Sequence, residues 1–186
     1  MRRIEKAKSS YYRDVVSIYA LSYEDVPEAL RPSEIQRQET LDRINEDIDN
    51  GGLFLLISDY RPLAYAVVSD DLVGTFFPKS HSFSSASALA DKMGQEEERL
   101  CVLRDIHVPV TSKRKGIAYD LLQSILGRYP HTSWILWVNE NNVPALRLFE
   151  KCGFSSLGVQ DIEQEGRSIV LYKKYRPSGL CREARW

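Results

Sequence analysis

The sequence predicts a single α/β domain, and three observations lead to that class. Short apolar runs typical of β-strands occur at residues 53–57, 63–68, 100–108 and 133–139. Segments with helical spacing of apolar residues alternate with them. At 186 residues, 43% hydrophobic and 27% charged, the chain has an ordinary globular composition and can bury a full core. We expect one domain over residues 1–175 and a flexible tail at residues 176–186.

The first fifty residues predict a strand followed by two helices. A short charged strand is expected near residues 2–8, and apolar spacing favours a helix over residues 11–21. Ser33 and Gln36 form the pattern of a capping box, so a second helix begins there, and the glycine pair at 51–52 ends it. Its inward-facing residues are expected to be Leu41, Ile44 and Ile48.

The middle of the chain predicts a strand pair and a long insertion. Residues 53–57 and 63–68 are expected to be adjacent antiparallel strands, with residues 59–62 as their turn. Residues 69–98 are serine-rich in part and have no clean period. An insertion of this kind is either a functional loop beside a substrate site or a disordered polar flap.

The second half alternates strands and helices. A strand at residues 100–108 precedes a helix over residues 117–126, for which Gly127 and Pro130 are stop signals. Residues 133–139 are almost continuously apolar, which indicates a strand buried on both faces. The next helix is expected to bury Ala145, Leu148, Phe149 and Cys152. The last strands are expected at residues 156–162 and 167–174.

Charge and cysteine content exclude several classes of partner. The 25 basic and 26 acidic side chains nearly cancel, so no nucleic acid or anionic membrane is expected as a partner. No apolar run is long enough to cross a bilayer, and no signal-peptide pattern opens the chain. Cys101, Cys152 and Cys181 are widely spaced, which argues against a disulfide framework or a zinc cluster. We expect a cytoplasmic protein without a metal site.

A basic, glycine-containing turn joins the strand ending at Val108 to the next helix. The residues of this turn are Lys113, Arg114, Lys115, Gly116, Ile117 and Ala118. A helix start has unpaired N–H groups and the positive end of the helix dipole, so it can hold a phosphate group. Gly116 permits close backbone approach. Neither a Rossmann fingerprint nor a P-loop occurs, and such a turn alone also fits a protein that binds nothing there.

A second motif follows the strand at residues 133–139. Its spacing is N-x-x-A-x-x-x-F-x-x-x-G-F, with residues Asn142, Ala145, Phe149, Gly153 and Phe154. Together the two motifs resemble those of the GNAT acyl-CoA-dependent N-acetyltransferases. The first corresponds to that family's [QR]-x-x-G-x-[GA] pyrophosphate loop, with Lys113 where Gln or Arg is usual. In the second, phenylalanine replaces the family's tyrosine.

The resemblance covers residues 53–174 well and the first fifty residues loosely. It implies a mixed, mostly antiparallel central sheet with flanking helices, in which two parallel strands splay apart. The pantetheine arm of acetyl-CoA would lie between the strands ending at Val108 and Asn139, paired with main-chain groups. The cofactor contacts that the resemblance implies are at Ile106, Val108, Val110, Lys113, Arg114, Lys115, Gly116, Ile117, Ala118, Asn142, Phe149 and Lys151. Asn142 also reads as a helix cap, and Lys151 also reads as a solvated lysine.

The implied reaction is the attack of an amine on a thioester, which requires a proton acceptor because such an amine has a pKa of about 10.4. In the family this base often lies on the strand before the turn, where the chain has Asp105 and His107. Strand alternation places both on one face and Arg104, Ile106 and Val108 on the other. Each candidate also has a structural interpretation, as a paired carboxylate and a hydrogen-bonded histidine.

Phe149 lacks the hydroxyl that family members use to protonate or hold the leaving sulfur. A thiol pKa of about 8.5 allows a thiolate to leave without full protonation, so turnover is not excluded. Cys152 is a conceivable substitute donor, although a buried helix cysteine is usually inert.

Three functions fit these residues. The first is an acetyl-CoA-dependent N-acetyltransferase acting on the primary amine of a small molecule. The second acetylates a protein at its N-terminus or a lysine, and the third is a noncatalytic acyl-CoA-binding regulatory module. The acceptor region of the family corresponds here to Tyr11, Tyr12, Tyr19, Tyr23 and residues 24–32. The sequence leaves the acceptor, the acyl chain and the oligomeric state open, a homodimer included.

Overall fold

The computed structural model describes residues 2–28, 31–69, 99–162 and 166–173. The described strands are β1 (Arg2–Lys6), β2 (Leu53–Ser58), β3 (Arg61–Ser69), β4 (Arg99–His107), β5 (Thr132–Asn139), β6 (Ser155–Ile162) and β7 (Gly166–Lys173). The described helices are α1 (Tyr12–Ser22), α2 (Glu34–Asp49), α5 (Ile117–Arg128) and α6 (Val143–Lys151), with short 3-10 turns at Ser9–Tyr11 and Val110–Ser112. The expected insertion at residues 69–98, apart from Ser69, and the expected tail lie outside the described residues.

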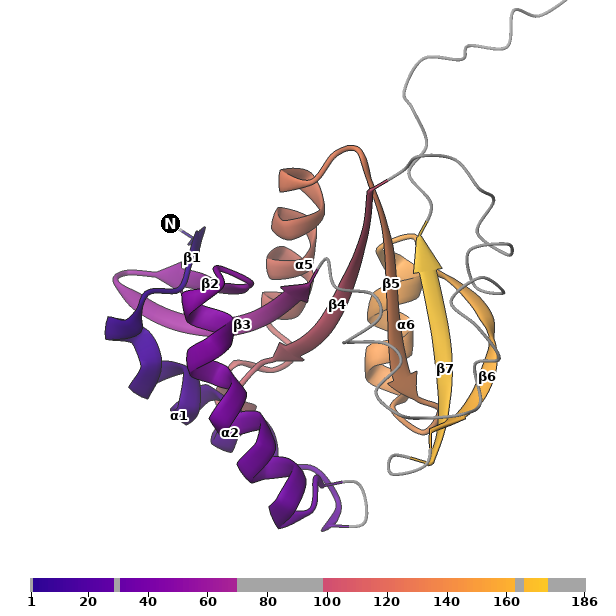
Figure 1. Cartoon of the computed structure of the whole chain (residues 1–186), viewed down its shortest axis with the longest axis horizontal. Helices are drawn as coiled ribbons and strands as arrows, with labels where there is room; N and C mark the ends of the chain where they lie inside the picture. Colours follow the sequence, from indigo (N-terminus) through magenta and orange to yellow (C-terminus); the bar gives the residue numbers. More distant parts are fainter. Residues whose placement is uncertain (1, 29–30, 70–98, 163–165, 174–186) are drawn as a thin grey trace, which may run out of the picture.

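The strands form one seven-stranded sheet in the order β1-β2-β3-β4-β5-β7-β6 (Figure 1). Only β4 and β5 pair in parallel among the described strands, and every other neighbouring pair is antiparallel. The expectation of a mixed, mostly antiparallel sheet with flanking helices is confirmed.

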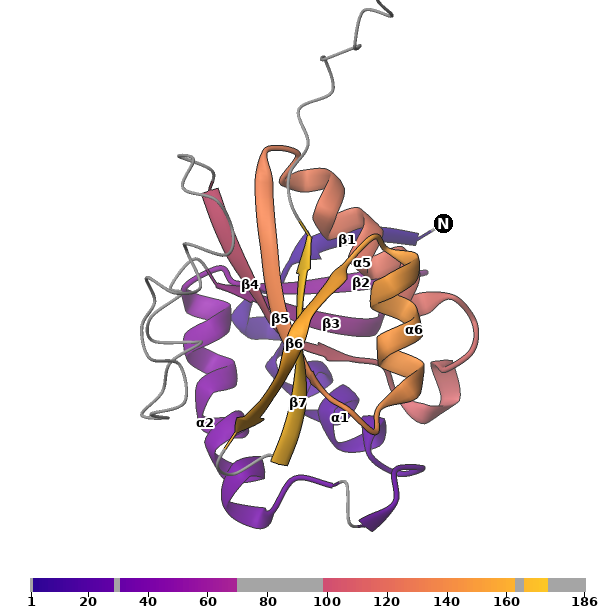
Figure 2. The same ribbon diagram turned by 90° about the vertical axis from the view of Figure 1, so that its right-hand side faces the viewer.

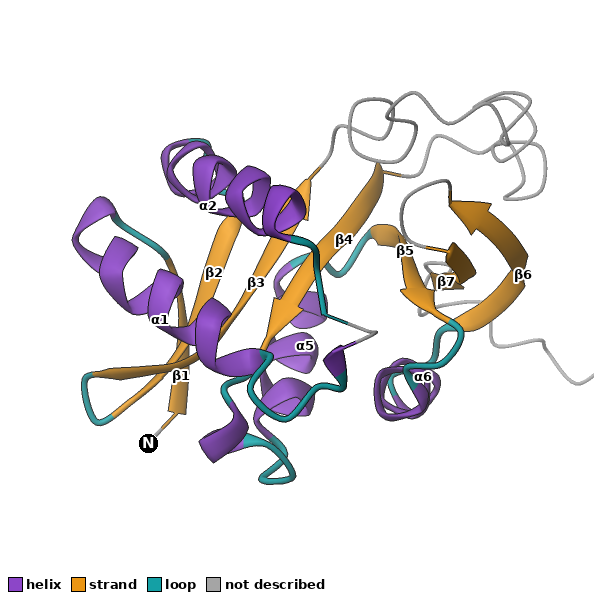
Figure 3. Cartoon of the chain, turned by 90° about the horizontal axis from the view of Figure 1, so that it is seen from below, coloured by secondary structure: helices purple, strands orange, loops and turns teal. Residues whose placement is uncertain are grey.

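Helices cover both faces of the sheet. Helices α1 and α2 pack on one face, and α5 and α6 pack on the other (Figures 2 and 3). Side chains of β2 alternate between these two cores, because Leu53 and Leu55 contact the α1–α2 side while Phe54 and Leu56 contact the α5 side. No helix within the described ranges combines the length and apolarity that a membrane span requires.

The turn between β2 and β3 is shorter than expected. Only Asp59 and Tyr60 lie outside the strands, and both have positive φ, at 49° and 63°. Two such residues fit the two-residue hairpin whose twist matches antiparallel strands. Arg61 and Pro62 therefore belong to β3, and the register shift next to the Ile57–Pro62 pair accommodates a proline without an N–H.

Helix boundaries follow the expected signals with one exception. The Ser33 hydroxyl accepts from the Gln36 N–H at 3.3 Å, and the Ser33 N–H donates to Gln36 Oε1 at 2.7 Å, which completes the predicted capping box. Helix α5 continues through Gly127 to Arg128, so Gly127 does not end it. A single glycine is tolerated there because the helix is anchored by its buried face.

Strand β4 contains a bulge that the sequence does not reveal. Val67 pairs with Asp105 and Val68 pairs with Leu103, which leaves Arg104 without a partner in β3. Leu103 therefore faces the α5 side, while Asp105 faces the α1–α2 side. The extra residue shifts the alternation at this point.

We predict that Ser33→Ala lowers the free energy of unfolding by about 1 kcal/mol, because it removes the acceptor of the α2 capping box. Urea denaturation measures the change. Ser17→Ala is the matched control, since Ser17 is an exposed residue inside α1 and caps nothing. Equal effects of the two substitutions would contradict a capping role for Ser33.

Candidate active site

Strands β4 and β5 separate at the point where the site begins. They pair from Arg99–Thr132 to Val102–Ile135, and no further pair joins them along the remainder of either strand. Figure 1 shows the two strands diverging below this point. The expectation of a splayed parallel pair is confirmed. The separation leaves main-chain groups of β4 on its β5 side without a strand partner.

The turn after β4 presents an open helix N-terminus. Gly116 is the N-cap of α5 with φ of 74°, and no side chain caps the helix. Ser33 and Asn142 do cap α2 and α6. A Cβ built on Gly116 meets no atom within 4 Å, so the space at this position of the turn is open. This arrangement fits a phosphate group.

The three basic side chains of the turn have different environments. Lys113 Nζ donates to Ser22 O at 2.9 Å and pairs with the Asp25 carboxylate, which lowers the pKa of Asp25 through this hydrogen bond. Lys113 therefore ties the turn to the end of α1 instead of projecting toward a phosphate. Lys115 Nζ donates to Thr111 O at 2.7 Å, and Arg114 is exposed.

Helix α6 lies beside the start of α5. Asn142 Oδ1 accepts from the Ala145 N–H at 3.3 Å, so its interpretation as a cap is confirmed. Lys151 Nζ lies 4.4 Å from the ring centroid of Tyr119, which places a cation beside the first turn of α5.

Phe149 of α6 and Cys152, the residue after α6, are packed inside the protein. Phe149 is 3% exposed and meets Phe154 edge-on at 5.6 Å. Burial raises the pKa of the Cys152 thiol against the opposing influence of Gln123 and two lysines. The thiol is therefore protonated and shielded, in keeping with an inert cysteine.

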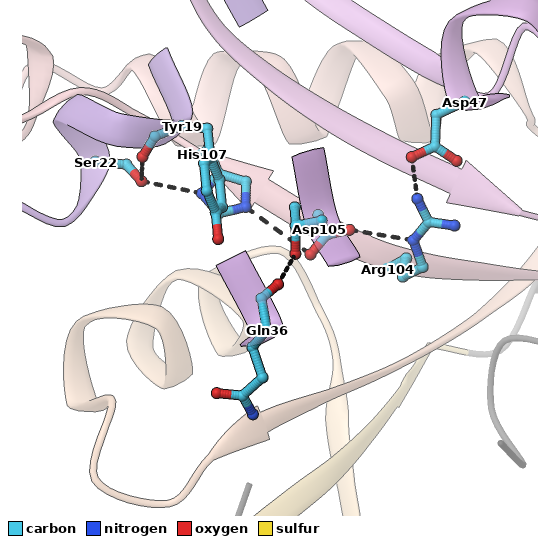
Figure 4. A network of polar contacts seen from close by, with 8 residues as sticks. Tyr19, Ser22, Gln36, Asp47, Arg104, Asp105 and His107 are labelled. Atoms are coloured by element: carbon cyan, nitrogen blue, oxygen red, sulfur yellow. Dashed lines mark hydrogen bonds and ion pairs between the residues drawn. The ribbon is translucent and has the colours of Figure 1, made fainter. Parts of the chain in front are cut away.

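Asp105 and His107 face the same side of β4, as expected, and they lie next to each other. His107 Nε2 is 3.8 Å from Asp105 Oδ1, and His107 Nδ1 is 3.0 Å from Ser22 Oγ (Figure 4). The Ser22 hydroxyl donates to Tyr19 O at 2.7 Å, so we assign it as the acceptor of a proton on His107 Nδ1. Nε2 is then the ring atom that can take up a proton.

Three tyrosines surround the His107 ring. Tyr65 stacks on it with centroids 4.8 Å apart, while Tyr19 and Tyr23 approach at 5.2 Å and 5.7 Å. Aromatic contacts on several sides therefore hold the imidazole ring in place. We call His107 and Asp105 together the imidazole–carboxylate pair.

Arg104 lies on the same face as Asp105, which corrects the expectation that it shares the opposite face with Ile106 and Val108. Its Nε donates to Asp105 Oδ2 at 3.1 Å, and its Nη2 pairs with Asp47 of α2. The bulge at Arg104 is the reason. Ile106 and Val108 do pack toward the α5 side, as expected.

The charges around Asp105 determine its ionisation. Burial acts to raise the pKa of Asp105, but the hydrogen bond and charge of His107, together with Arg104, outweigh it and lower the pKa to about 2. Asp105 is therefore ionised at neutral pH and is a weak base, suited to stabilise a cation on His107. The pair can hold a proton on Nε2.

The sequence identified the turn, the splayed strands and the imidazole–carboxylate pair, but it missed the groups that support the pair. Ser22, Tyr65, Arg104 and Asp47 lie far apart along the chain and share no motif. Within the described segments, no group of three or more His, Cys, Asp or Glu side chains is arranged to hold a metal ion.

We predict that Asp105→Asn lowers stability by about 1–2 kcal/mol at neutral pH and that the difference shrinks in acid. The pKa of Asp105 is about 2 in the folded chain and about 3.9 when unfolded, so its contribution is present above about pH 4 and is lost as pH falls toward 2. Urea midpoints across that range measure it. The exposed Asp49 provides the control, Asp49→Asn. A difference that does not narrow with acid would contradict the depressed pKa.

Comparison with known proteins gives a family and a fold. A family model described as the acetyltransferase (GNAT) family matches residues 14–154. A search of curated proteins finds no significant match.

Solved structures resemble the chain over nearly its whole length. PH1933 from Pyrococcus horikoshii OT3 is 21% identical to this chain with a TM-score of 0.65, and the match covers 95% of this chain and 99% of PH1933. The ribosomal-protein-S18-alanine N-acetyltransferase from Escherichia coli is 14% identical to this chain with a TM-score of 0.63, and the match covers 100% of this chain and 99% of that protein. A GNAT acetyltransferase from Streptococcus agalactiae 2603 is 15% identical to this chain with a TM-score of 0.69, and the match covers 92% of this chain and 94% of that protein.

These structural likenesses show the fold, and the family model covers both the splayed strands and the open helix N-terminus. The chain belongs to the acetyltransferase (GNAT) family.

Proposed function

We propose that the protein is a cytoplasmic, acetyl-CoA-dependent N-acetyltransferase that transfers the acetyl group directly to the primary amine of a small molecule. One observation carries the proposal. The splayed edge of β4, the uncapped start of α5 and the imidazole–carboxylate pair all occur along one stretch of chain, from residue 103 to residue 119. A thioester bound along this stretch would lie beside a group able to accept a proton.

The residues fit acetyl-CoA at three places. The N–H groups of Gly116, Ile117 and Ala118 suit its pyrophosphate, with Arg114 and Lys115 nearby for charge. The main chain at Ile106 suits an amide of the pantetheine arm, since β4 has no strand partner there on its β5 side. Val108 and Val110 follow the end of β4, with Val110 in the 3-10 turn, and their main chain is proposed to continue the same contact. Asn142 caps the start of α6, and Lys151, at the other end of α6, lies beside the first turn of α5.

In the proposed reaction, the amine nitrogen bonds to the thioester carbon, the carbon–sulfur bond breaks, and the amine proton passes to His107 Nε2. Asp105 stabilises the imidazolium that results, and Ser22 holds the ring through Nδ1. Asp105 itself is too weakly basic, with its pKa of about 2, to be the main proton acceptor.

The sulfur leaves as a thiolate in this proposal. Phe149 has no hydroxyl, and its ring is packed against Phe154. A thiol pKa of about 8.5 makes the thiolate an adequate leaving group, so it can take its proton from solvent.

The acceptor is proposed to be small because of the position of His107. His107 is 8% exposed, and its ring is surrounded by Tyr19, Tyr23 and Tyr65. A compact amine needs less room than a polypeptide backbone to reach Nε2. Acetylation of a protein N-terminus or lysine would use the same residues.

Incubation of the protein with acetyl-CoA and a metabolite extract, and separately with a peptide library, tests the reaction by mass spectrometry. Acetylated small amines are expected, whereas acetylated peptides would transfer the assignment to a protein acceptor. Binding of acetyl-CoA without any product would indicate a noncatalytic acyl-CoA-binding module.

With the acceptor identified, we predict that His107→Asn lowers kcat about 10²–10⁴-fold because the proton acceptor is lost. The affinity for acetyl-CoA, measured by calorimetry, should stay unchanged. His131→Asn is the control, since His131 is exposed before β5. Activity of His107→Asn within a few-fold of wild type would exclude His107 as the base.

We predict that Gly116→Glu abolishes acetyl-CoA binding, because a carboxylate would stand where phosphates are proposed to bind. Gly127→Glu adds the same charge at the exposed far end of α5, where a Cβ also meets nothing within 4 Å, and should bind normally. Gly116→Ala separates charge from the strain of a positive φ, which costs about 1 kcal/mol. Unchanged binding by Gly116→Glu would remove the phosphate assignment.

A further inference from the structure

Two carboxylates share Arg104 behind the proposed proton acceptor. Arg104 comes from the bulge of β4 and lies between Asp105, on its own strand, and Asp47, on α2 (Figure 4). The side chains of Arg104 and Asp47 are 17% and 13% exposed, so solvent screens them only in part. A charge on α2 is thereby connected to the imidazole–carboxylate pair.

We propose that Asp47 is a positioning residue that, through Arg104, leaves Asp105 free to stabilise a proton on His107. The inference rests on the proposed function, in which His107 takes the proton of the acceptor amine.

The net charge of three neighbouring side chains decides whether a cation on His107 has a counter-charge. Asp47, Arg104 and Asp105 together carry one negative charge, which a protonated His107 neutralises. Without the charge of Asp47, Arg104 alone would cancel Asp105, and the imidazolium would have no net counter-charge. Partly buried charges interact appreciably with charged neighbours, since the effective dielectric constant around them is about 20 rather than the 80 of water.

Other groups that face His107 do not supply this charge. Tyr19 and Tyr65 are neutral at pH 7, since a tyrosine has an ordinary pKa of about 10 and burial raises the pKa of both further. Tyr23 and Ser22 are uncharged contacts from the end of α1. Arg37 and Arg43 of α2 also influence Tyr19, but both are exposed to solvent, which screens them.

Stability alone does not account for Asp47 in this position. Burial raises the pKa of Asp47 even though Arg104 opposes it, so ionising this carboxyl in place has a cost. Buried ion pairs often contribute little net stability for this reason. A role of Asp47 in stabilising the proton on His107 would explain why an ionised carboxyl is kept at this position.

The direct test is proton uptake by the imidazole–carboxylate pair, followed through the His107 ring signals by NMR in the full-length protein. Asp47→Asn should lower the midpoint by about 0.5 pH, because a negative charge is removed. Arg104→Gln should raise it, because a positive charge is removed. Loss of packing alone would not move the two midpoints in opposite directions.

Glu46→Gln is the matched control, since it removes the same charge from an exposed neighbour of Asp47 on α2 and should leave the midpoint unchanged. If Arg104→Gln does not fold, Asp47→Asn decides alone. A midpoint in Asp47→Asn equal to that of Glu46→Gln overturns the inference.

The pH dependence of kcat provides the second readout. Its acidic limb should move to lower pH in Asp47→Asn, with kcat above the limb reduced and the KM for acetyl-CoA unchanged. NMR does not depend on turnover. A failure of the proposed function can therefore be distinguished from a failure of the role inferred for Asp47. A midpoint shift without any acetyl transfer overturns the proposed function and the catalytic part of this inference, whereas acetyl transfer without a midpoint shift overturns this inference alone.

Discussion

The β-bulge at Arg104 is the constraint on which the site depends. Strict alternation from Leu103 would turn Asp105 and His107 toward α5, into an apolar core. One unpaired residue in β4 turns both toward α1 and α2 instead, where Ser22 and the tyrosines receive the imidazole. The same residue supplies the guanidinium that holds Asp105. A local irregularity therefore orients the polar groups and also contributes a charge to them.

The two faces of the sheet contribute different groups to the site, and both sets of groups lie close to β4. Helices α5 and α6 bury a mainly apolar core, and the open N-terminus of α5 adjoins the main chain that follows β4. Helices α1 and α2 bring polar side chains to the opposite face, close to the end of the same strand. Lys113 connects these regions, because it leaves the turn and pairs with Asp25 beyond α1.

The capping pattern of the helices shows where backbone groups are kept open. Ser33 and Asn142 satisfy N–H groups at the starts of α2 and α6, whereas α5 begins at a glycine with no side-chain cap. Uncapped N–H groups are a cost unless solvent or an anion meets them. Asp120, an acidic residue in the first turn of α5, is paired with Arg2, so its charge does not oppose an anion there.

The sequence by itself determined the elements and the two cofactor motifs, because strand alternation, helical spacing, the capping box and glycine at the turn are local properties. It also placed Asp105 and His107 on one face. Tertiary structure decided what surrounds them. The bulge at Arg104 arises from pairing with β3, and the contacts of Ser22, Tyr65 and Asp47 join segments distant along the chain. Local propensity holds no information on such long-range contacts, since the packing of α1, α2 and β3 against one strand creates them.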